Sequence, residues 1–306
     1  MQNNRFLLTS LIIMTGATYQ AQADNIPNYS PLVFGATYVS AGADAEFGGD
    51  IVAKTYFVGG ADTKVTGSIQ SGTAITLGAN SKVDNDTDSG TATTLGASVT
   101  VINSYYGTAF TLGAGATSNE NARTQDHLDY TEIKVTQRRK DLSLLDVGLL
   151  VKNKLKTTMD VTTILSPLSD FHGVAADGAE SATVITDNQV VYNLDSLTTG
   201  AGITLMLKDG YDYVFNITDM LSLGAGTKIV MCSDITQQLV CTESNSNNTV
   251  TWNLGGYASI GEDAEMIGTV LANGYISTGV DSKMTKGVLY SETSYVTIGA
   301  SGTVYP

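Results

Sequence analysis

A glycine that returns at an almost constant interval limits the possible folds of this chain more than any other part of its sequence. Gly42, Gly60, Gly78 and Gly96 are equally spaced, and Gly113 follows one position earlier than the spacing requires. The series resumes in the carboxyl-terminal third with Gly224, Gly261, Gly279 and Gly299. A fixed short period, here roughly 18 residues, indicates a solenoid, in which each repeat buries its apolar face against its neighbours.

The residues around each glycine recur in fixed positions as well. Two residues after it stands a turn former, such as Asp44, Asp62 or Asn80, because these residues adopt corner conformations that others resist. The positions one and three residues before it are apolar, a spacing that predicts a strand with one inward face. We therefore predict a mainly β protein, a β-solenoid with three short strands per coil. A β-sandwich with accidental glycine spacing is the alternative, which the aligned columns disfavour.

Residues 119–156 lack the corner glycines and have a different pattern. Apolar side chains recur there every seven residues, which predicts one long amphipathic α-helix. These side chains are Leu128, Val135, Leu142 and Leu149. We expect the helix to lie along the solenoid over Val52, Leu271 and Leu289, which are apolar yet predicted to face outward.

Residues 1–23 have the pattern of a secretory signal peptide. Arg5 precedes an apolar run over 6–14, and Ala21-Gln22-Ala23 matches a cleavage site. We expect cleavage after Ala23 and a secreted, extracellular protein, because neither this run nor any later one is long enough to span a membrane. Residues 24–306 are predicted to form a single domain. Its expected order is first coils at 24–118, the helix at 119–156, and an irregular segment with later coils at 157–306.

The chain is acidic and poor in groups that perform catalysis. Acidic residues number 30 against 16 Lys and Arg, and the net charge of −14 argues against nucleic acid as a partner. The two histidines, His127 and His172, are expected to be surface or hydrogen-bonded residues, and no catalytic or phosphate-binding motif occurs. We therefore predict no enzyme activity, no cofactor and no metal site. Calcium at the corner aspartates is disfavoured, because the glycine-rich repeat of calcium-binding β-rolls is absent.

Cys232 and Cys241 flank a short polar stretch. In an oxidising compartment this arrangement predicts a local disulfide, with two free thiols as the alternative. Such a short closed loop would stabilise the fold by about 2–3 kcal/mol at most.

One predicted outward face is almost free of charge. Two residues before the corner glycine stands a hydroxyl residue in every coil except the one that contains Val58. This hydroxyl column consists of Ser40, Thr76, Thr94, Thr111, Ser222, Ser259, Ser277 and Thr297. Stacked coils repeat at about 4.8 Å, so we expect a regular flat array. A ladder retained for β propensity and cross-strand hydrogen bonding is the alternative.

A second uncharged column stands four residues before each glycine. It is alanine at Ala74, Ala92 and Ala109, and these three residues complete the candidate binding face. Elsewhere it is mostly tyrosine, at Tyr38, Tyr56, Tyr257, Tyr275 and Tyr295.

The carboxyl-terminal third resembles a known family. The run Trp252-Asn-Leu-Gly-Gly-Tyr-Ala-Ser-Ile-Gly261, followed by Gly268-Thr-Val-Leu-Ala272, is similar to the W-x-[VL]-G-x-x-A-x-[LI]-G … G-[TN]-[IV]-[LM]-A run of the microbial ice-binding proteins with a discontinuous β-solenoid. Residues 202–210 and 213–217 are similar to the preceding coils of that family. The resemblance covers 190–306 well and 32–118 by pattern alone.

This resemblance implies a right-handed solenoid of triangular cross-section, with the helix packed alongside and coils that do not stack in sequence order. It implies a secreted ice-binding protein with antifreeze activity or inhibition of ice recrystallisation, and no catalysis. The implied partner is an ice crystal surface; we expect no membrane insertion and a monomer. The ice-contacting face of the family has no strict motif, so the candidate residues remain those of the hydroxyl and alanine columns.

Two other functions fit parts of the pattern. An exported structural or adhesive module would bind glycan or another surface, with the tyrosine column as an aromatic platform. A solenoid polysaccharide lyase needs clustered cations and acids in a groove, whereas half of the cations lie in the predicted helix. The lyase is therefore disfavoured.

Overall fold

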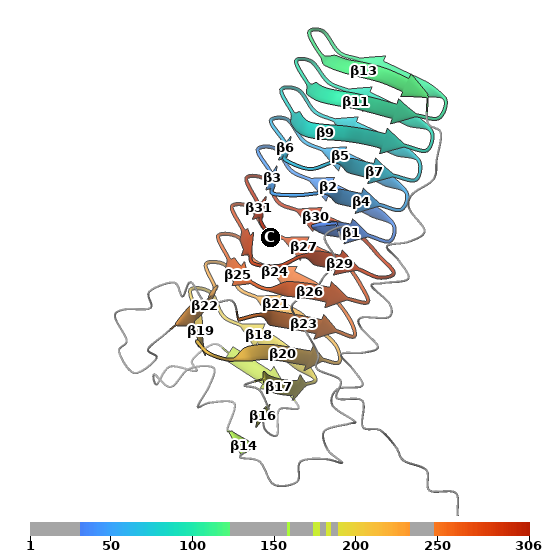
Figure 1. The fold of residues 1–306 in the computed structure, drawn as a ribbon. Helices are drawn as coiled ribbons and strands as arrows, with labels where there is room; N and C mark the ends of the chain where they lie inside the picture. The colour runs from blue at the N-terminus through green and yellow to red at the C-terminus, as the bar shows by residue number, and fades with distance from the viewer. Residues whose placement is uncertain (1–30, 123–157, 160–173, 178–181, 185–188, 233–247) are drawn as a thin grey trace, which may run out of the picture.

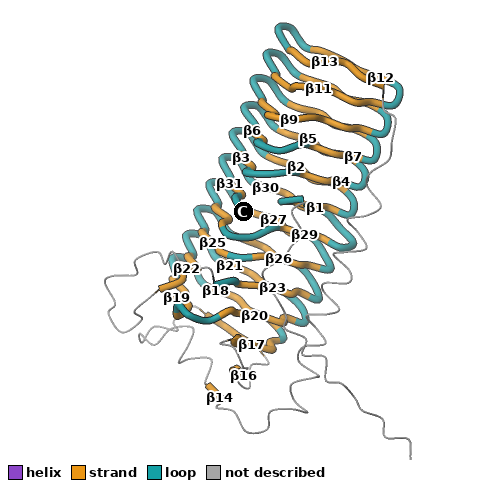
Figure 2. Tube along the Cα trace, in the orientation of Figure 1, coloured by secondary structure: helices purple, strands orange, loops and turns teal. Residues whose placement is uncertain are grey.

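The computed structural model describes residues 31–122, 158–159, 174–177, 182–184, 189–232 and 248–306. They form a stack of coils in which short strands alternate with tight corners (Figure 1). Strands and corners fall at the same places in successive coils (Figure 2), which confirms the prediction of stacked parallel strands. No helix occurs among the described residues. Accordingly, none in this part of the chain could cross a membrane.

Face I is an eleven-stranded sheet along the length of the stack. Its strands are parallel except β15, which pairs antiparallel with β18 at the lower end. From top to bottom they are β12 (Ala109–Leu112), β10 (Ala92–Leu95), β8 (Ala74–Leu77), β5 (Tyr56–Gly59), β2 (Tyr38–Ala41), β30 (Val296–Ile298), β27 (Ile276–Thr278), β24 (Ala258–Ile260), β21 (Leu221–Leu223), β18 (Ser196–Thr199) and β15 (Val174–Asp177).

The other two sides of each coil belong to one twenty-stranded sheet. Face II consists of β6 (Lys64–Val65), β3 (Glu46–Phe47), β31 (Thr303–Val304), β28 (Lys283–Thr285), β25 (Glu265–Ile267), β22 (Lys228–Cys232) and β19 (Thr204–Lys208). Face III consists of β7 (Ile69–Ser71), β4 (Ile51–Ala53), β1 (Val33–Gly35), β29 (Leu289–Ser291), β26 (Thr269–Ala272), β23 (Val250–Leu254), β20 (Asp212–Ile217) and β17 (Gln189–Leu194).

Each end of the stack departs from this pattern. At the top, three long strands continue from face II onto face III: β9 (Lys82–Ser89), β11 (Thr100–Tyr106) and β13 (Thr117–Ala122). At the bottom, β16 (Ala182–Val184) pairs antiparallel with both β17 and β14 (Thr158–Met159). Antiparallel strands thus cover the lower edges of face I, through β15, and of face III, through β16.

The stacking order does not follow the sequence. The first coil lies on the last one, because β1 pairs with β29, β2 with β30 and β3 with β31. The blue and red parts of the chain therefore meet in the middle of the stack (Figure 1). The hydroxyl of Tyr290 also donates a 2.7 Å hydrogen bond to the carbonyl of Pro31 across this junction.

The conformation of the corners explains why a glycine recurs in each coil. Asp44 and Asp62, two residues after their glycines, have φ near 58°, a left-handed conformation that Asx residues tolerate. The glycine itself is needed for close approach: a Cβ on Gly60 would lie 2.6 Å from the carbonyl carbon of Gly42 in the next coil. Corner glycines stack in this way down to Gly200, which begins a coil outside the predicted series.

Inward side chains form columns through the core. On face III, the rings of Tyr192, Phe215 and Trp252 stack with centroids 4.8 and 4.1 Å apart, and all three are fully buried. Further up, the column becomes aliphatic, and in the top coils it becomes polar. There the Thr87 hydroxyl donates to Ser104 at 2.8 Å. The upper coils are thus held by buried hydroxyl pairs as well as by apolar burial.

The prediction of a helix over 119–156 is wrong for its first residues. Residues 119–122 belong to β13, because the backbone continues the register of β11 and pairs Asn119 with Asn103. The Asn119 amide donates to Asn103 Oδ1 at 3.3 Å. Residues 123–156 lie outside the described part of the chain.

One of the three residues over which the helix is predicted to pack is placed wrongly. Leu289 points into the core, because its register pairs it with the inward Val33. The neighbouring Tyr290 takes the outward place, beside Leu271 and Phe34. These outward apolar side chains on face III are at most 5% exposed, as is Val52.

Candidate functional site

Face I carries no charged side chain from β12 down to β18. Strand alternation explains which residues it shows to solvent. In β8, for example, Ile75 and Leu77 are buried, whereas Ala74 and Thr76 lie at the surface. The outward positions are therefore the hydroxyl column and the alanine or tyrosine column.

All eight predicted hydroxyl residues lie in one column along face I. Strand register gives the order Thr111, Thr94, Thr76, Val58, Ser40, Thr297, Ser277, Ser259 and Ser222 from top to bottom. The column continues to Thr198, which is absent from the predicted face. The signal for it was present, since Gly200-Ala-Gly202 repeats Gly224-Ala-Gly226, but the coil between them is longer than the regular period.

In the three uppermost coils, the hydroxyl and alanine columns of face I carry only small side chains. We call Ala74, Thr76, Ala92, Thr94, Ala109 and Thr111 the threonine–alanine patch. All three threonines are exposed, and the alanines are exposed or half-buried. Parallel pairing sets each alanine beside an alanine and each threonine beside a threonine.

The next five coils down present tyrosines instead. From the top, the tyrosine ladder consists of Tyr56, Tyr38, Tyr295, Tyr275 and Tyr257. Neighbouring ring centroids lie 4.9, 4.7, 5.4 and 4.7 Å apart, and neighbouring planes differ by at most 16°. The rings therefore cover one another's faces and leave their edges outward. An aromatic platform on these tyrosines would therefore present mainly ring edges to a ligand.

A third column, of threonines, stands at the corner that leads into face I. Its members lie five residues before a corner glycine: Thr37, Thr55, Thr73, Thr91 and Thr108. The hydroxyls of Thr55 and Thr73 donate to carbonyl oxygens of the adjacent coil, and Thr108 does the same to Thr91 at 3.1 Å. The glycine period marks this column in the sequence, although it is absent from the predicted face. Its hydrogen bonds fix neighbouring coils to each other beside the threonine–alanine patch.

Two phenols of the ladder, those of Tyr38 and Tyr275, have a raised pKa. Burial first, and then the neighbouring Tyr295 and Tyr56, raise the pKa of Tyr38 above its ordinary value. Burial and the neighbouring Tyr257 and Tyr295 raise the pKa of Tyr275 in the same way. A phenol that stays neutral keeps this half of face I free of charge.

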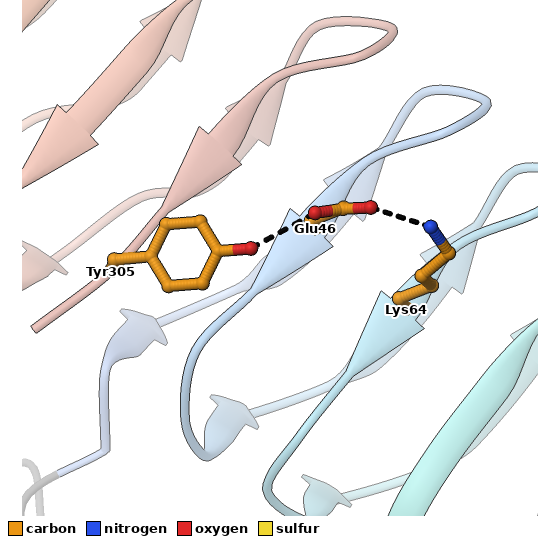
Figure 3. A network of polar contacts seen from close by, with 3 residues as sticks. All are labelled: Glu46, Lys64 and Tyr305. Atoms are coloured by element: carbon orange, nitrogen blue, oxygen red, sulfur yellow. Dashed lines mark hydrogen bonds and ion pairs between the residues drawn. The ribbon is translucent and has the colours of Figure 1, made fainter.

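The charges that face I lacks are found on face II. Lys64 Nζ lies 2.6 Å from Glu46 Oε1, and the Tyr305 hydroxyl donates to Glu46 Oε2 at 2.9 Å (Figure 3). These hydrogen bonds, the one from Lys64 first, lower the pKa of Glu46. The network links the last coil to the first two, because Tyr305 follows β31 and Lys64 lies in β6.

Several predicted features fall outside the described residues. Cys232 ends β22, but Cys241 is not described, so the disulfide stays a prediction. The two histidines and the predicted signal peptide also lie outside. Within the described residues, no three His, Cys, Asp or Glu side chains are grouped so as to hold a metal ion.

No protein-family model matches this chain, and no curated protein matches its sequence. Among solved structures, a crystal structure matches it with 18% sequence identity and a TM-score of 0.42, over 90% of this chain and 94% of that one. The chain is thus similar to an ice-binding protein from an Antarctic ascomycete, Antarctomyces psychrotrophicus.

Proposed function

We propose that this chain is a secreted, monomeric ice-binding protein that adsorbs to ice through the threonine–alanine patch. The observation that carries the proposal is the register of the patch. The same Ala-x-Thr triplet stands side by side on β8, β10 and β12, with its threonines exposed and no charged residue in these strands. Its side chains repeat at about 4.8 Å, the distance between hydrogen-bonded strands.

Rigidity makes such an array suitable for adsorption. Each strand of the patch is hydrogen-bonded to its neighbours, and the corner threonines add bonds between coils. Ordering the surface on contact therefore costs little conformational entropy. Many weak van der Waals and water-mediated contacts then sum to firm adsorption, and adsorbed molecules pin the growing ice front.

The lower half of face I is a less suitable ice contact. Ser40 and Ser277 belong to the predicted face, but each stands beside the taller column of the tyrosine ladder. A large crystal surface would meet the tyrosine edges first. We therefore place the main contact on the patch, and assign the serines of the lower coils a secondary role.

We also propose a right-handed coil, a helix within 123–156 beside face III, and a leader that is cleaved after Ala23. A buried apolar column on the outer side of face III supports the helix, because an outward Phe34 and Leu271 at 1% exposure must be covered.

The test replaces Thr94, at the centre of the patch, by tyrosine in the chain 24–306. We expect the Thr94→Tyr variant to lose thermal hysteresis and crystal shaping in a nanolitre osmometer, because a bulky side chain lifts the array off the ice. Circular dichroism should stay unchanged, since the side chain points to solvent.

Thr100→Tyr is the matched control. Thr100 is an exposed strand threonine on β11, shortly after Thr94 in the chain, and belongs to face II. We expect this variant to keep full activity. Full activity of Thr94→Tyr would show that another face binds ice. A folded wild-type protein with no hysteresis, no shaping and no inhibition of recrystallisation would refute the proposed function.

A further inference from the structure

The tyrosine ladder is a second continuous surface on face I. It is assembled from two distant parts of the sequence, because Tyr38 and Tyr56 come from the first coils and the other three tyrosines from the last. The junction of β2 with β30 brings Tyr38 against Tyr295, with ring centroids 4.7 Å apart. The ladder therefore spans five coils without a gap.

A row of hydroxyl residues runs beside the ladder. Its members are Ser40, Thr297, Ser277 and Ser259, which occupy the next outward position on β2, β30, β27 and β24. The two rows run side by side, because Tyr38 and Ser40 occupy successive outward positions on β2. Together they form a strip of hydroxyl groups that repeats once per coil.

The chemistry of this strip restricts its ligand. Tyrosine edges carry partial positive charge, and the phenols and serines both donate and accept hydrogen bonds. No cation stands on these strands to bind a uronate or a phosphate. The net charge of −14 further repels a polyanion. A fitting ligand is thus long, uncharged and rich in hydroxyls.

One ring of the ladder also offers an open face. Tyr56 stacks on Tyr38 on one side, but on the other side its neighbour in register is the small Ala74. Tyr56 is 39% exposed. A sugar ring can pack its CH-bearing face on this side, at the step between the ladder and the threonine–alanine patch.

We infer that the tyrosine ladder and its hydroxyl row bind a neutral polysaccharide chain lying along the stack. Each monosaccharide meets one or two coils, through hydrogen bonds to the phenols and serines, and the last one packs on Tyr56. The contacts are individually weak, so binding depends on the uninterrupted length of the ladder. This activity is separate from ice adsorption, which uses the coils above.

The test measures depletion of the folded chain 24–306 from solution by microcrystalline cellulose and by chitin, with alginate beads as the charged comparison. We expect binding to at least one neutral polymer and none to alginate. The double variant Tyr38→Ser/Tyr295→Ser interrupts the ladder at its centre. We expect it to bind about tenfold more weakly, a loss of about 1.4 kcal/mol.

Three further variants keep the result interpretable. Tyr105→Ser removes a half-buried tyrosine from face III and should bind as the wild type does. Tyr38→Phe/Tyr295→Phe retains the stack and loses only hydroxyls, so it tests the proposal if the serine variant fails to fold; it should bind less tightly than the wild type. Thr94→Tyr should lose ice activity and keep polysaccharide binding.

Three results would overturn the inference. The first is a wild-type protein that binds no neutral polymer, and the second is equal binding to alginate. The third is a folded ladder variant that binds as tightly as the wild type. Because ice activity is measured on the same proteins, failure of polysaccharide binding would leave the ice-binding proposal standing.

Discussion

Each tyrosine of the ladder packs against its neighbours, and for Tyr38 and Tyr275 this packing disfavours a charge on the phenol. Each tyrosine of the ladder covers the ring face of the next, with Tyr38 between Tyr56 and Tyr295. Ionisation of one phenol would place a negative charge within one ring spacing of its neighbours. Burial first, and then this proximity of the neighbouring phenols, raises the pKa of Tyr38 and of Tyr275.

High pH should therefore destabilise the fold through the ladder. The folded pKa of Tyr38 lies above the ordinary value of 10.0, so its contribution to stability is complete below about pH 10. That contribution is lost as the pH rises through the folded pKa, because the unfolded phenol releases its proton first. We expect the midpoint of urea unfolding to fall above pH 10.

Phenolate absorbance measured in parallel should show two ladder phenols that titrate later than free tyrosine. The variant Tyr38→Phe/Tyr275→Phe is the control, because it keeps the rings and removes these protons; its midpoint should fall less steeply above pH 10. An equal fall in both proteins would assign the alkaline loss to groups outside these two residues.

Among the strands, β5 is the boundary between the two halves of face I. It carries Tyr56 and Val58 where the neighbouring β8 carries Ala74 and Thr76 in the same register. Val58 is the one residue of the column without a hydroxyl among the nine predicted coils, and it is 40% exposed. The backbone of β5 continues the regular register of β8, so only the two side chains Tyr56 and Val58 end the threonine–alanine patch.

Converting β5 to the patch sequence should enlarge the proposed ice contact. The variant Tyr56→Ala/Val58→Thr extends the Ala-x-Thr array to a fourth coil. We expect higher thermal hysteresis at equal protein concentration, because more contacts hold each adsorbed molecule. Thr66→Ala, an exposed change that leaves face I intact, should have no effect. Unchanged hysteresis in the four-coil variant would contradict the expectation that a larger Ala-x-Thr array holds each adsorbed molecule more firmly.

For the molecule as a unit, the junction between the first and last coils decides whether the stack unfolds in one step. It is held by three parallel strand pairs and by buried side chains such as Phe47, which is 1% exposed. The Glu46 network across the same junction is largely exposed, and exposed ion pairs contribute little because solvent and salt screen them. Apolar burial should therefore dominate the junction.

Replacing Phe47 by alanine should destabilise the protein by about 3–5 kcal/mol, the usual cost of truncating a buried aromatic side chain. Glu46→Gln should change stability little. The single tryptophan, Trp252, lies below the junction and reports on the lower half. We expect its fluorescence transition in urea to shift together with circular dichroism.

A solenoid can also unfold in parts, since each coil contacts only its neighbours. An unshifted tryptophan transition in Phe47→Ala, with a circular dichroism curve that splits in two, would show that the halves unfold separately. The junction would then be a contact between two units rather than part of one cooperative core.

The architecture of a single coil follows from local sequence. Corner glycines and left-handed turn formers are local requirements, and alternating apolar residues decide which side chains face inward, so strands, corners and the outward columns could be predicted from the period. Local spacing misplaces Leu289, because the coil between Gly279 and Gly299 is longer than the regular period and shifts the strand by one position. Local pattern also fails for residues 119–122, because β13 extends past the last corner without an apolar alternation to mark it.

The order of the coils, in contrast, depends on long-range pairing. Every coil has a similar apolar interior and similar corners, so local pattern does not specify which coil lies on which. Pairing of β2 with β30 sets Tyr38 against Tyr295 and makes one ladder from two halves of the chain. It also places the threonine–alanine patch at one end of face I. Local sequence decides which residues lie on face I. Pairing between strands that are far apart in the sequence decides how these residues are ordered along the face, with the small-residue patch at one end and the aromatic strip joined into one.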